Sequence, residues 1–372
     1  MARLGDYVRI RTGKLDANAS SENGQYPFFT CAVEPLKIDS YSYECECVLV
    51  AGNGDLNVKY YNGKFDAYQR TYIIESLDKT VLSVPYLYHY LDKYVETLRN
   101  QAIGGVIKYI KLGNLTEANI PIPAVTEQES IVEKIGKVNE LISLRKEQLA
   151  KLDQLVKSRF IELFGDPVDN PKNYMVKSLQ ELIDMGYITY HLDGNHGGDY
   201  PRSVEFVDSG VPYIGANSIV NGEINFSMAK YLTVERAGKL RKGIAQNEDV
   251  LFAHNATVGP TVVLHTTEPK VILSTSLTAY RCNKSQLLPN YLRTYMLSDG
   301  FIRQYSAEMK QTTRNQVPIT AQKKYLFLVP PIVEQEQFAT FVEQNDKTKL
   351  TIQASLDKLE VMKKAFMQEY FG

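Results

Sequence analysis

The most regular pattern of apolar and polar positions lies between residues 124 and 165. Apolar side chains recur there at alternating steps of four and three residues, which places one apolar stripe along a helix and is typical of a coiled coil. The stripe consists of Ile131, Ile135, Val138, Ile142, Leu149, Leu152, Val156 and Leu163, with Arg145 and Arg159 at the two remaining positions. Roughly 39 residues would span ~58 Å as a helix. Because one small domain cannot bury so long a stripe, the pattern predicts a partner helix.

A second segment repeats this one at an offset of 207 residues. Glu-Gln-Glu at 127–129 recurs at 334–336, and Glu-Leu-Phe-Gly at 162–165 recurs as Glu-Tyr-Phe-Gly at 369–372. The glycines that end both segments are typical helix stop signals. Asn345, Lys349 and Lys363 interrupt the second stripe; they either set the register or direction of a helix pair or mark where its seam is hydrated. The chain is therefore predicted to contain two copies of one unit, a globular domain followed by a long helix.

Each long helix is expected to pair with the other copy. We expect the pairing to depend on apolar residues in both helices. These are Ile131, Ile135, Leu149, Leu152 and Phe164 in the first helix and Phe338, Val342, Leu356, Leu359 and Phe371 in the second.

The globular segments repeat more faintly. Residues 46–53 resemble 248–255 at an offset of 202, and 27–29 resemble 212–214 at an offset of 185, so the second copy has 17 additional residues between these landmarks. Short strands are predicted at 48–51, 58–61 and 72–74, with Asn62-Gly63 as a hairpin turn, and helices at 85–98 and 289–303. The fold class is α+β with twisted, partly antiparallel sheets. The predicted boundaries are 1–123 and 174–330 for the domains, 124–173 and 331–372 for the helices and linker.

Composition narrows the class of protein. The chain has 372 residues, of which 44% are hydrophobic and 23% charged, as in folded globular proteins, and no apolar run approaches the length of a membrane span. The N-terminal residues lack an apolar signal, so a cytoplasmic location is expected. Four scattered cysteines favour reduced thiols and no metal site. The net charge of −1 means that any nucleic-acid surface must be a local basic patch, and only residues 174–330 are net basic.

The sequence contains polar and basic side chains suited to binding rather than a recognisable catalytic motif. No nucleotide-binding P-loop or His-Glu-x-x-His motif is present, so the sequence predicts no enzyme. Thr312, Thr313, Arg314, Asn315 and Gln316 form a polar series whose arginine and amide groups could read guanine and adenine edges. Residues 105–109 take this place in the first copy. Arg236, Lys239, Arg241 and Lys242 form a cluster suited to phosphate contacts or simply a solvated helix face. Arg9, Arg11, Lys14 and Lys59 are weaker counterparts in the first domain.

Together these motifs resemble the specificity subunit of type I restriction-modification enzymes. The resemblance is carried by Pro-x-x-x-Glu-Gln-Glu at 123–129 and 330–336, by the long helix after each, and by the endings Glu-Leu-Phe-Gly-Asp and Glu-Tyr-Phe-Gly. It implies two target-recognition domains, each reading one half of a split asymmetric DNA site, held apart by an antiparallel coiled coil of the two helices. The first recognition domain is shorter than the second, which sets it apart from the family pattern.

The resemblance also implies partners and cofactors. Double-stranded DNA would be read by this chain, and two DNA adenine methyltransferase (modification) subunits would dock on the helix pair and use S-adenosylmethionine. Restriction subunits, where present, would add cleavage driven by ATP and Mg²⁺. The chain itself would be non-catalytic and hold no cofactor. Two other hypotheses are a coiled-coil scaffold without base-specific DNA reading, and a self-sufficient nuclease or methyltransferase.

Overall fold

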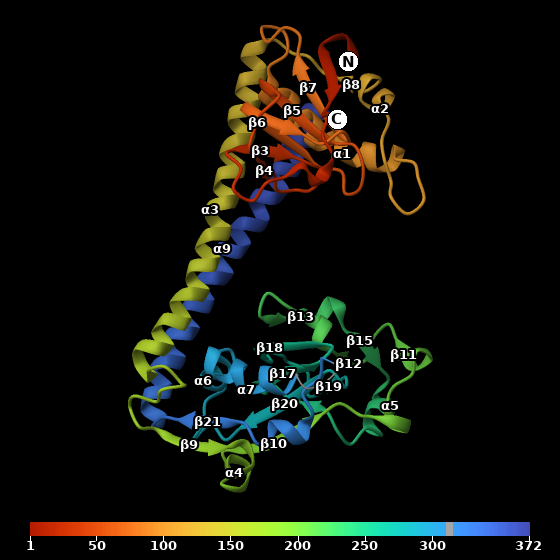
Figure 1. The fold of residues 1–372 in the computed structure, drawn as a ribbon. Helices are drawn as coiled ribbons and strands as arrows, with labels where there is room; N and C mark the ends of the chain where they lie inside the picture. The colour runs from red at the N-terminus through yellow and green to blue at the C-terminus, as the bar shows by residue number, and fades with distance from the viewer. Residues whose placement is uncertain (310–314) are drawn as a thin grey trace. The chain divides into compact units, whose positions relative to one another are not determined.

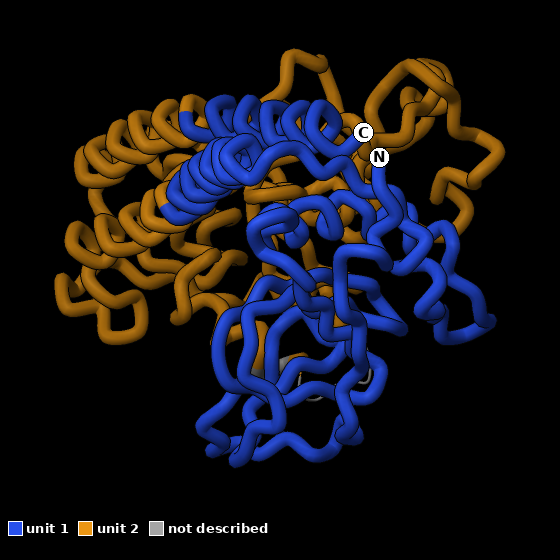
Figure 2. The backbone as a smooth tube through the Cα atoms, turned by 90° about the horizontal axis from the view of Figure 1, so that it is seen from above, with its two compact units in different colours: residues 1–147, 352–372 blue, residues 148–351 orange. Residues whose placement is uncertain are grey.

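The computed structural model describes residues 1–309 and 315–372 of the chain, which folds into two compact units. Unit 1 comprises residues 1–147 and 352–372, and unit 2 comprises residues 148–351 (Figure 2). Both units draw on two long helices, α3 (Val125–Phe164) and α9 (Ile332–Phe371), each of 40 residues (Figure 1). Each unit thus combines one globular domain with the beginning of one long helix and the end of the other.

The ends of the long helices confirm the predicted stop signals. Gly165 and Gly372 have φ angles of +79° and +89°, the left-handed conformation that closes a helix and that glycine adopts without a Cβ penalty. A Cβ at residue 165 would also lie 2.4 Å from Cγ of Pro171, so the linker chain passes directly over this glycine. The left-handed conformation explains the glycine in both copies, and the approach of Pro171 adds a second reason at Gly165.

Within each unit the two helices run antiparallel. In unit 1 Lys146 Nζ lies 3.3 Å from Glu360, and the Lys134 ammonium lies 5.8 Å above the Tyr370 ring. In unit 2 an ion pair of 2.7 Å joins Lys349 to Asp153, and farther along α3 the Arg159 guanidinium lies over the ring of Phe341. In both units later residues of α3 therefore meet earlier residues of α9.

The residues predicted for the helix pair divide into two groups. Ile131, Ile135, Phe164, Phe338, Val342, Leu356 and Phe371 are buried, whereas Leu149, Leu152 and Leu359 are only half-buried. Except for Leu356, the first group lies near the helix ends, where a globular domain adds a further layer. The second group lies in the middle of the helices. The coiled-coil geometry of that middle stretch stays a prediction.

Unit 1 is built on a six-stranded sheet with the order β2-β7-β5-β6-β3-β4. Only β3 and β6 pair in parallel. The strands are β2 (Val8–Thr12), β3 (Tyr26–Phe29), β4 (Leu36–Ile38), β5 (Tyr43–Ala51), β6 (Val58–Ala67) and β7 (Thr71–Ser76), with a separate pair β1 (Ala2–Arg3) and β8 (Asn119–Ile120). Helix α1 (Val84–Gln101) supplies much of the apolar core beneath the sheet, and α2 (Leu112–Thr116) follows. The predicted helix at 85–98 is confirmed.

The predicted hairpin turn at Asn62-Gly63 is wrong. Both residues lie inside β6, where Asn62 pairs with Glu46 and Gly63 with Cys45 of β5. Gly63 has a φ of +146°, which glycine adopts easily, so the ladder continues through it. The actual connection between β5 and β6 lies at residues 52–57.

Unit 2 contains two larger sheets, with orders β10-β20-β17-β18 and β11-β15-β12-β19-β16, and the pairs β13-β14 and β21-β9. The strands are β9 (Met175–Ser178), β10 (Ile188–Asp193), β11 (Phe206–Val207), β12 (Val211–Ile214), β13 (Ile219–Val220), β14 (Glu223–Ile224), β15 (Lys230–Leu232), β16 (Ile244–Ala245), β17 (Val250–Asn255), β18 (Thr257–Val263), β19 (Val271–Leu273), β20 (Leu277–Cys282) and β21 (Leu326–Val329). The helices are α4 (Leu179–Asp184), α5 (Val234–Gly238), α6 (Pro289–Met296), α7 (Asp299–Met309) and α8 (Ile319–Gln322).

The single helix predicted at 289–303 is two helices, α6 and α7. Ser298 lies at the break, where its hydroxyl donates to the Tyr295 carbonyl at 2.6 Å and accepts from the Phe301 amide at 3.4 Å. A side chain that satisfies backbone groups on both sides offers the chain an alternative to continuous helix. This explains why the helix restarts at Asp299.

Gln128 and Gln335, at the centre of the repeated Glu-Gln-Glu, are fully buried and make the same three hydrogen bonds in the two units. Gln128 accepts from the Ser83 amide at 2.9 Å and donates to the carbonyls of Val81 and Pro123, both at 2.8 Å. Ser83 is the residue that caps α1.

In unit 2 the side chain of Gln335 repeats this arrangement. It accepts from the Leu288 amide at 2.8 Å and donates to the carbonyls of Gln286 and Pro330 at 3.1 and 2.9 Å. Leu288 is the residue before α6. The repeated glutamine thus fastens the start of a domain helix to the start of a long helix in each unit.

Candidate nucleic-acid interface

One end of the main sheet in unit 1 is formed by the turn after β5. The Gly54 amide donates to the Lys108 carbonyl at 2.9 Å, and the Ile110 amide donates to the Gly52 carbonyl at 2.9 Å. Gly54 has a φ of +70°, a left-handed turn conformation. These bonds attach the loop that follows α1 to the end of β5.

Unit 2 repeats these two backbone hydrogen bonds at the end of β17. The Ala256 amide donates to the Asn315 carbonyl at 3.0 Å, and the Val317 amide donates to the His254 carbonyl at 2.8 Å. Ala256 repeats the left-handed conformation with a φ of +65°. The offset of 202 that relates 46–53 to 248–255 in the sequence therefore relates equivalent backbone positions.

The start of the neighbouring strand is also duplicated. The Gly52 amide donates to the Arg70 carbonyl at 2.8 Å, just as the His254 amide donates to the Ser276 carbonyl at 3.0 Å. The segments before these strands attach in the same way, since the amides of Tyr68 and Ser274 donate to carbonyls at the ends of β3 and β12.

In each unit a glycine follows a strand at this end of the sheet: Gly13 follows β2 in unit 1, and Gly194 follows β10 in unit 2. A Cβ at Gly13 would lie 2.0 Å from the Ala67 carbonyl oxygen, and one at Gly194 would lie 2.3 Å from the Ser274 carbonyl carbon. Such close backbone approach excludes larger residues. We call the surface formed by these segments the loop edge; it comprises residues 13–14, 52–54, 68–70 and 103–110 in unit 1 and residues 194–196, 254–256, 274–276 and 315–317 in unit 2.

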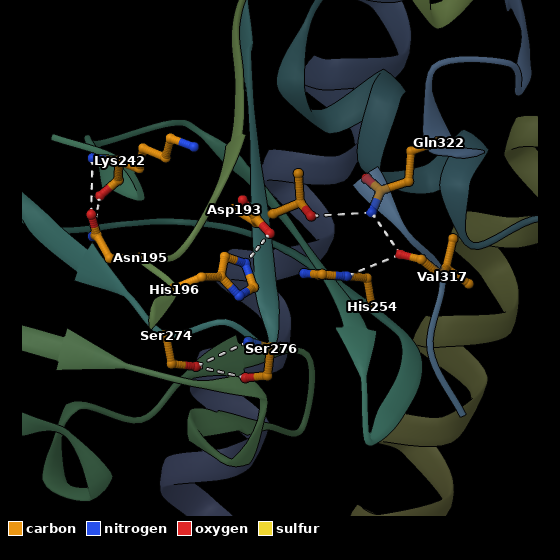
Figure 3. A network of polar contacts seen from close by, with 10 residues as sticks. Asp193, Asn195, His196, Lys242, His254, Ser274, Ser276, Val317 and Gln322 are labelled. Carbon is orange, nitrogen blue, oxygen red and sulfur yellow. Dashed lines mark hydrogen bonds and ion pairs between the residues drawn. The ribbon is translucent and has the colours of Figure 1, made fainter. Parts of the chain in front are cut away.

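A polar network crosses the loop edge of unit 2 (Figure 3). The Asn195 amide donates to the Lys242 carbonyl at 2.6 Å, and His254 Nδ1 donates to the Val317 carbonyl at 3.0 Å. Asp193 lies 2.7 Å from Nε2 of His196. The network places the backbones of Lys242 and Val317 at one edge of the same sheet.

The predicted residues of unit 2 differ in how much of their side chain is available. Arg241 and Lys242 are exposed, and Lys239 is exposed but 2.8 Å from Glu235. Arg236 is bound to Glu205 at 2.6 Å and to the Asp199 carbonyl at 3.0 Å, so it holds the loop before β11 against α5. Asn315 is exposed and Gln316 half-buried. Thr312, Thr313 and Arg314 lie outside the described residues. The roles of these residues in DNA binding stay predictions.

The predicted residues of unit 1 do not gather in one place. Lys14 is exposed on the loop edge. Arg11 lies on β2, 2.8 Å from Glu75 and stacked over the Tyr43 ring at 4.9 Å. Lys59 lies on β6, two strands beyond β7 in the sheet order, and burial lowers the pKa of its ammonium group. Only Lys14 shares the surface that corresponds to the network in unit 2.

Sequence reasoning missed two residues of the loop edge, Arg70 and His254, and named Lys108 only within the segment 105–109 that replaces the polar series. The sequence signal was present in the offset of 202, which aligns residue 52 with His254. It could not be extended to Arg70, because the segment before β7 meets the end of β5 only through strand pairing.

Buried histidines make the stability of both units sensitive to acid. Burial lowers the pKa of His191 in unit 2 to about 4, and burial together with Lys363 lowers that of His89 in unit 1 to about 4. Since an unfolded histidine titrates near 6.5, the unfolded chain binds the extra protons. The contribution of each neutral histidine to the free energy of unfolding is therefore fully present above pH ~6.5. It is lost as the pH falls toward 4, by up to ~3 kcal/mol for each group.

This acid sensitivity can be measured as the thermal midpoint at pH 7.5 and at pH 5. We expect a clear fall for the wild type and a smaller fall for His191→Gln in unit 2. The control His265→Gln removes an exposed histidine and should behave as the wild type. Equal falls for His191→Gln and the wild type would refute the assignment to His191.

Within residues 1–309 and 315–372, no group of three or more His, Cys, Asp or Glu side chains is arranged to hold a metal ion. No helix in the same ranges is both long and apolar enough to cross a membrane.

The duplicated α+β domains, each with a loop edge and each joined to a 40-residue helix, define a class of proteins built from two copies of one unit. A family model for the type I restriction modification DNA specificity domain matches residues 1–154 and 171–361. The chain therefore belongs to this family.

Individual relatives agree with the family assignment. The specificity subunit of the type I restriction enzyme EcoDI from Escherichia coli is 38% identical over 154 residues, which cover 41% of this chain and 34% of that protein. The match thus spans about a third of the length of this curated relative.

Solved structures extend the likeness of fold to the whole chain. The S subunit of a type I restriction-modification system from M. genitalium matches with a TM-score of 0.64 at 16% identity, covering 100% of this chain and 95% of that one. A chain from a structure on complex assembly and conformational transition of the type I system matches with a TM-score of 0.55 at 17% identity, covering 100% and 96%. At these identities the likeness shows the fold alone.

Proposed function

We propose that this chain is the DNA-reading specificity subunit of a type I restriction-modification system, with each unit binding one half of a bipartite, asymmetric site. The observation that carries the proposal is a loop edge with the same backbone and different side chains in the two units. The equivalent positions are Lys14 and Asn195, Gly52 and His254, Arg70 and Ser276, and Lys108 and Asn315. Equivalent backbones would present two surfaces to DNA in the same manner, while unequal side chains would select different bases.

Catalysis and cofactors belong, on this proposal, to partner subunits. Two modification subunits would methylate adenine from S-adenosylmethionine, and restriction subunits, where present, would use ATP and Mg²⁺. Units 1 and 2 each pack a domain helix against the ends of α3 and α9 in the same arrangement. This similarity supports the binding of two identical partner subunits, one to each unit. The complex would act on cytoplasmic DNA, with the 40-residue helices setting the spacing of the half-sites.

The methylome of cells that express this chain with its modification subunit tests the proposed function. We expect adenine methylation at one motif made of two unlike halves separated by a fixed spacer. A continuous palindrome, or no methylation with an active modification subunit, would contradict the proposal.

Replacing Arg241 and Lys242 by alanine separates DNA reading from a scaffold without base reading. A scaffold predicts the same methylation as the wild type. DNA reading predicts weaker methylation, because exposed cations contribute to phosphate binding.

A further inference from the structure

Arg70 stands at a fixed backbone position on the loop edge of unit 1. Its carbonyl accepts from the Gly52 amide at 2.8 Å and from the Cys31 thiol at 3.6 Å. A Cβ at residue 52 would lie 2.3 Å from that carbonyl oxygen, so the two backbone segments approach closely here. Thr71, the next residue, already pairs with Ala51 in the sheet. The side chain of Arg70 therefore projects from a rigid strand start, which suits a group that must meet a base edge accurately.

The guanidinium of Arg70 is exposed and, among the described residues, has no hydrogen-bond or ion-pair partner. Of the other arginines of unit 1, Arg3, Arg11 and Arg99 each pair with a carboxylate, whereas Arg9 is exposed within β2, outside the loop edge. The adjacent Gln69 is also occupied, because its amide donates to Asp16 at 2.6 Å. Arg70 thus keeps all its donors available for a ligand.

The equivalent position in unit 2 is arranged differently. The Ser276 hydroxyl accepts from the Ala216 amide at 2.8 Å and lies 2.7 Å from the Ser274 hydroxyl (Figure 3). Its hydrogen bonds are therefore made within the unit. Asn195 is likewise used to hold the backbone of Lys242, which belongs to the segment that is longer in unit 2. In unit 2 this added segment lies on the loop edge. The loop edge of unit 1 has no such segment and stays open around Arg70.

The surroundings of Arg70 suit DNA rather than another anion. Lys14 and Lys108 lie on the same loop edge and are exposed, so they can contact phosphates on either side of a groove. An unpaired arginine between them has the fork of donors that matches O6 and N7 of guanine. Resting on the function proposed above, we infer that Arg70 reads a guanine in the half-site bound by unit 1, whereas unit 2 lacks this contact.

The test is the methylome of the complete complex carrying Arg70→Lys or Arg70→Ser. Lysine keeps the charge but cannot form the bidentate contact. We expect both variants to relax the motif at one guanine position of one half-site, with discrimination there falling roughly 5- to 150-fold, and to leave the other half-site unchanged. Arg3→Ser, which removes an exposed arginine of β1 that pairs with Glu117 in the same unit, should leave every position intact.

Two results would overturn the inference about Arg70. In one, the motif stays unchanged, Arg70→Ser lowers methylation equally at all sites, and Arg70→Lys retains normal methylation. This is the behaviour of a phosphate contact. The other is a relaxed position that is not a guanine on either strand. If the wild type already methylates a bipartite motif and the variants do not alter it, the inference alone fails. If the wild type reads no bipartite motif, the proposed function fails and the inference with it.

Discussion

Replacing Phe371 by alanine should destabilise the N-terminal domain by about 3–5 kcal/mol. Phe371, on the last turn of α9, is buried in unit 1, with ring centroids 5.2 and 6.2 Å from those of Tyr86 and Tyr90 on α1. Both tyrosines are themselves fixed, because their hydroxyls donate to the carbonyls of Pro121 and Asn119 at 2.9 and 3.1 Å. Since neighbours held in this way cannot collapse into the space, alanine would leave a cavity.

Phe164→Ala is the matched variant in unit 2. Phe164 is 1% exposed, and its ring centroid lies 4.9 Å from those of Phe160 and Tyr291 and 5.5 Å from that of Phe338. The Tyr291 hydroxyl donates to the Leu328 carbonyl at 2.9 Å, as Tyr86 does to Pro121. We expect a loss of similar size, confined to the domain of unit 2.

Hydrogen exchange resolved by peptide distinguishes the two losses. Phe371→Ala should accelerate exchange in α1, and Phe164→Ala should accelerate it in α6. Val361→Ala on α9 is the control, because Val361 is 67% exposed and its truncation should cost little. Unchanged protection of α1 in Phe371→Ala would show that the end of α9 does not support the first domain.

The long helices could be predicted from the sequence because their signals are local. The apolar spacing of α3 and the glycines at 165 and 372 lie within the elements that they define. The direction of pairing was not contained in the spacing, since the same stripe serves parallel and antiparallel partners. It came from the resemblance to the family, and contacts such as Lys349 with Asp153 now support it within each unit.

The strands and the candidate interface were harder to predict because their signals are non-local. Asn62-Gly63 has the composition of a turn, but pairing of β6 with β5 along its length overrides that preference. Arg236 belongs to a basic cluster in the sequence, yet Glu205, 31 positions away, occupies it. Arg70 has no neighbouring basic residue to mark it, and it joins Lys14 and Lys108 only after three segments meet.

Replacing Gln335 by leucine should destabilise unit 2 by about 3 kcal/mol or more, and Gln128→Leu should do the same to unit 1. Leucine fits the space but leaves three buried backbone groups, the Leu288 amide and the carbonyls of Gln286 and Pro330, without their partner. Each unsatisfied group costs ~1–3 kcal/mol, because water cannot replace the lost bond in a site where the side chain is fully buried.

The exposed neighbour Glu336 offers the control Glu336→Leu, which removes a carboxylate without uncovering a backbone group. Urea unfolding followed by hydrogen exchange in α1 and α6 should show a large loss for the glutamine variants and little change for the control. If Gln335→Leu were as stable as Glu336→Leu, the repeated Glu-Gln-Glu would have to be retained for contacts with a partner subunit rather than for fastening the domain helix to the long helix.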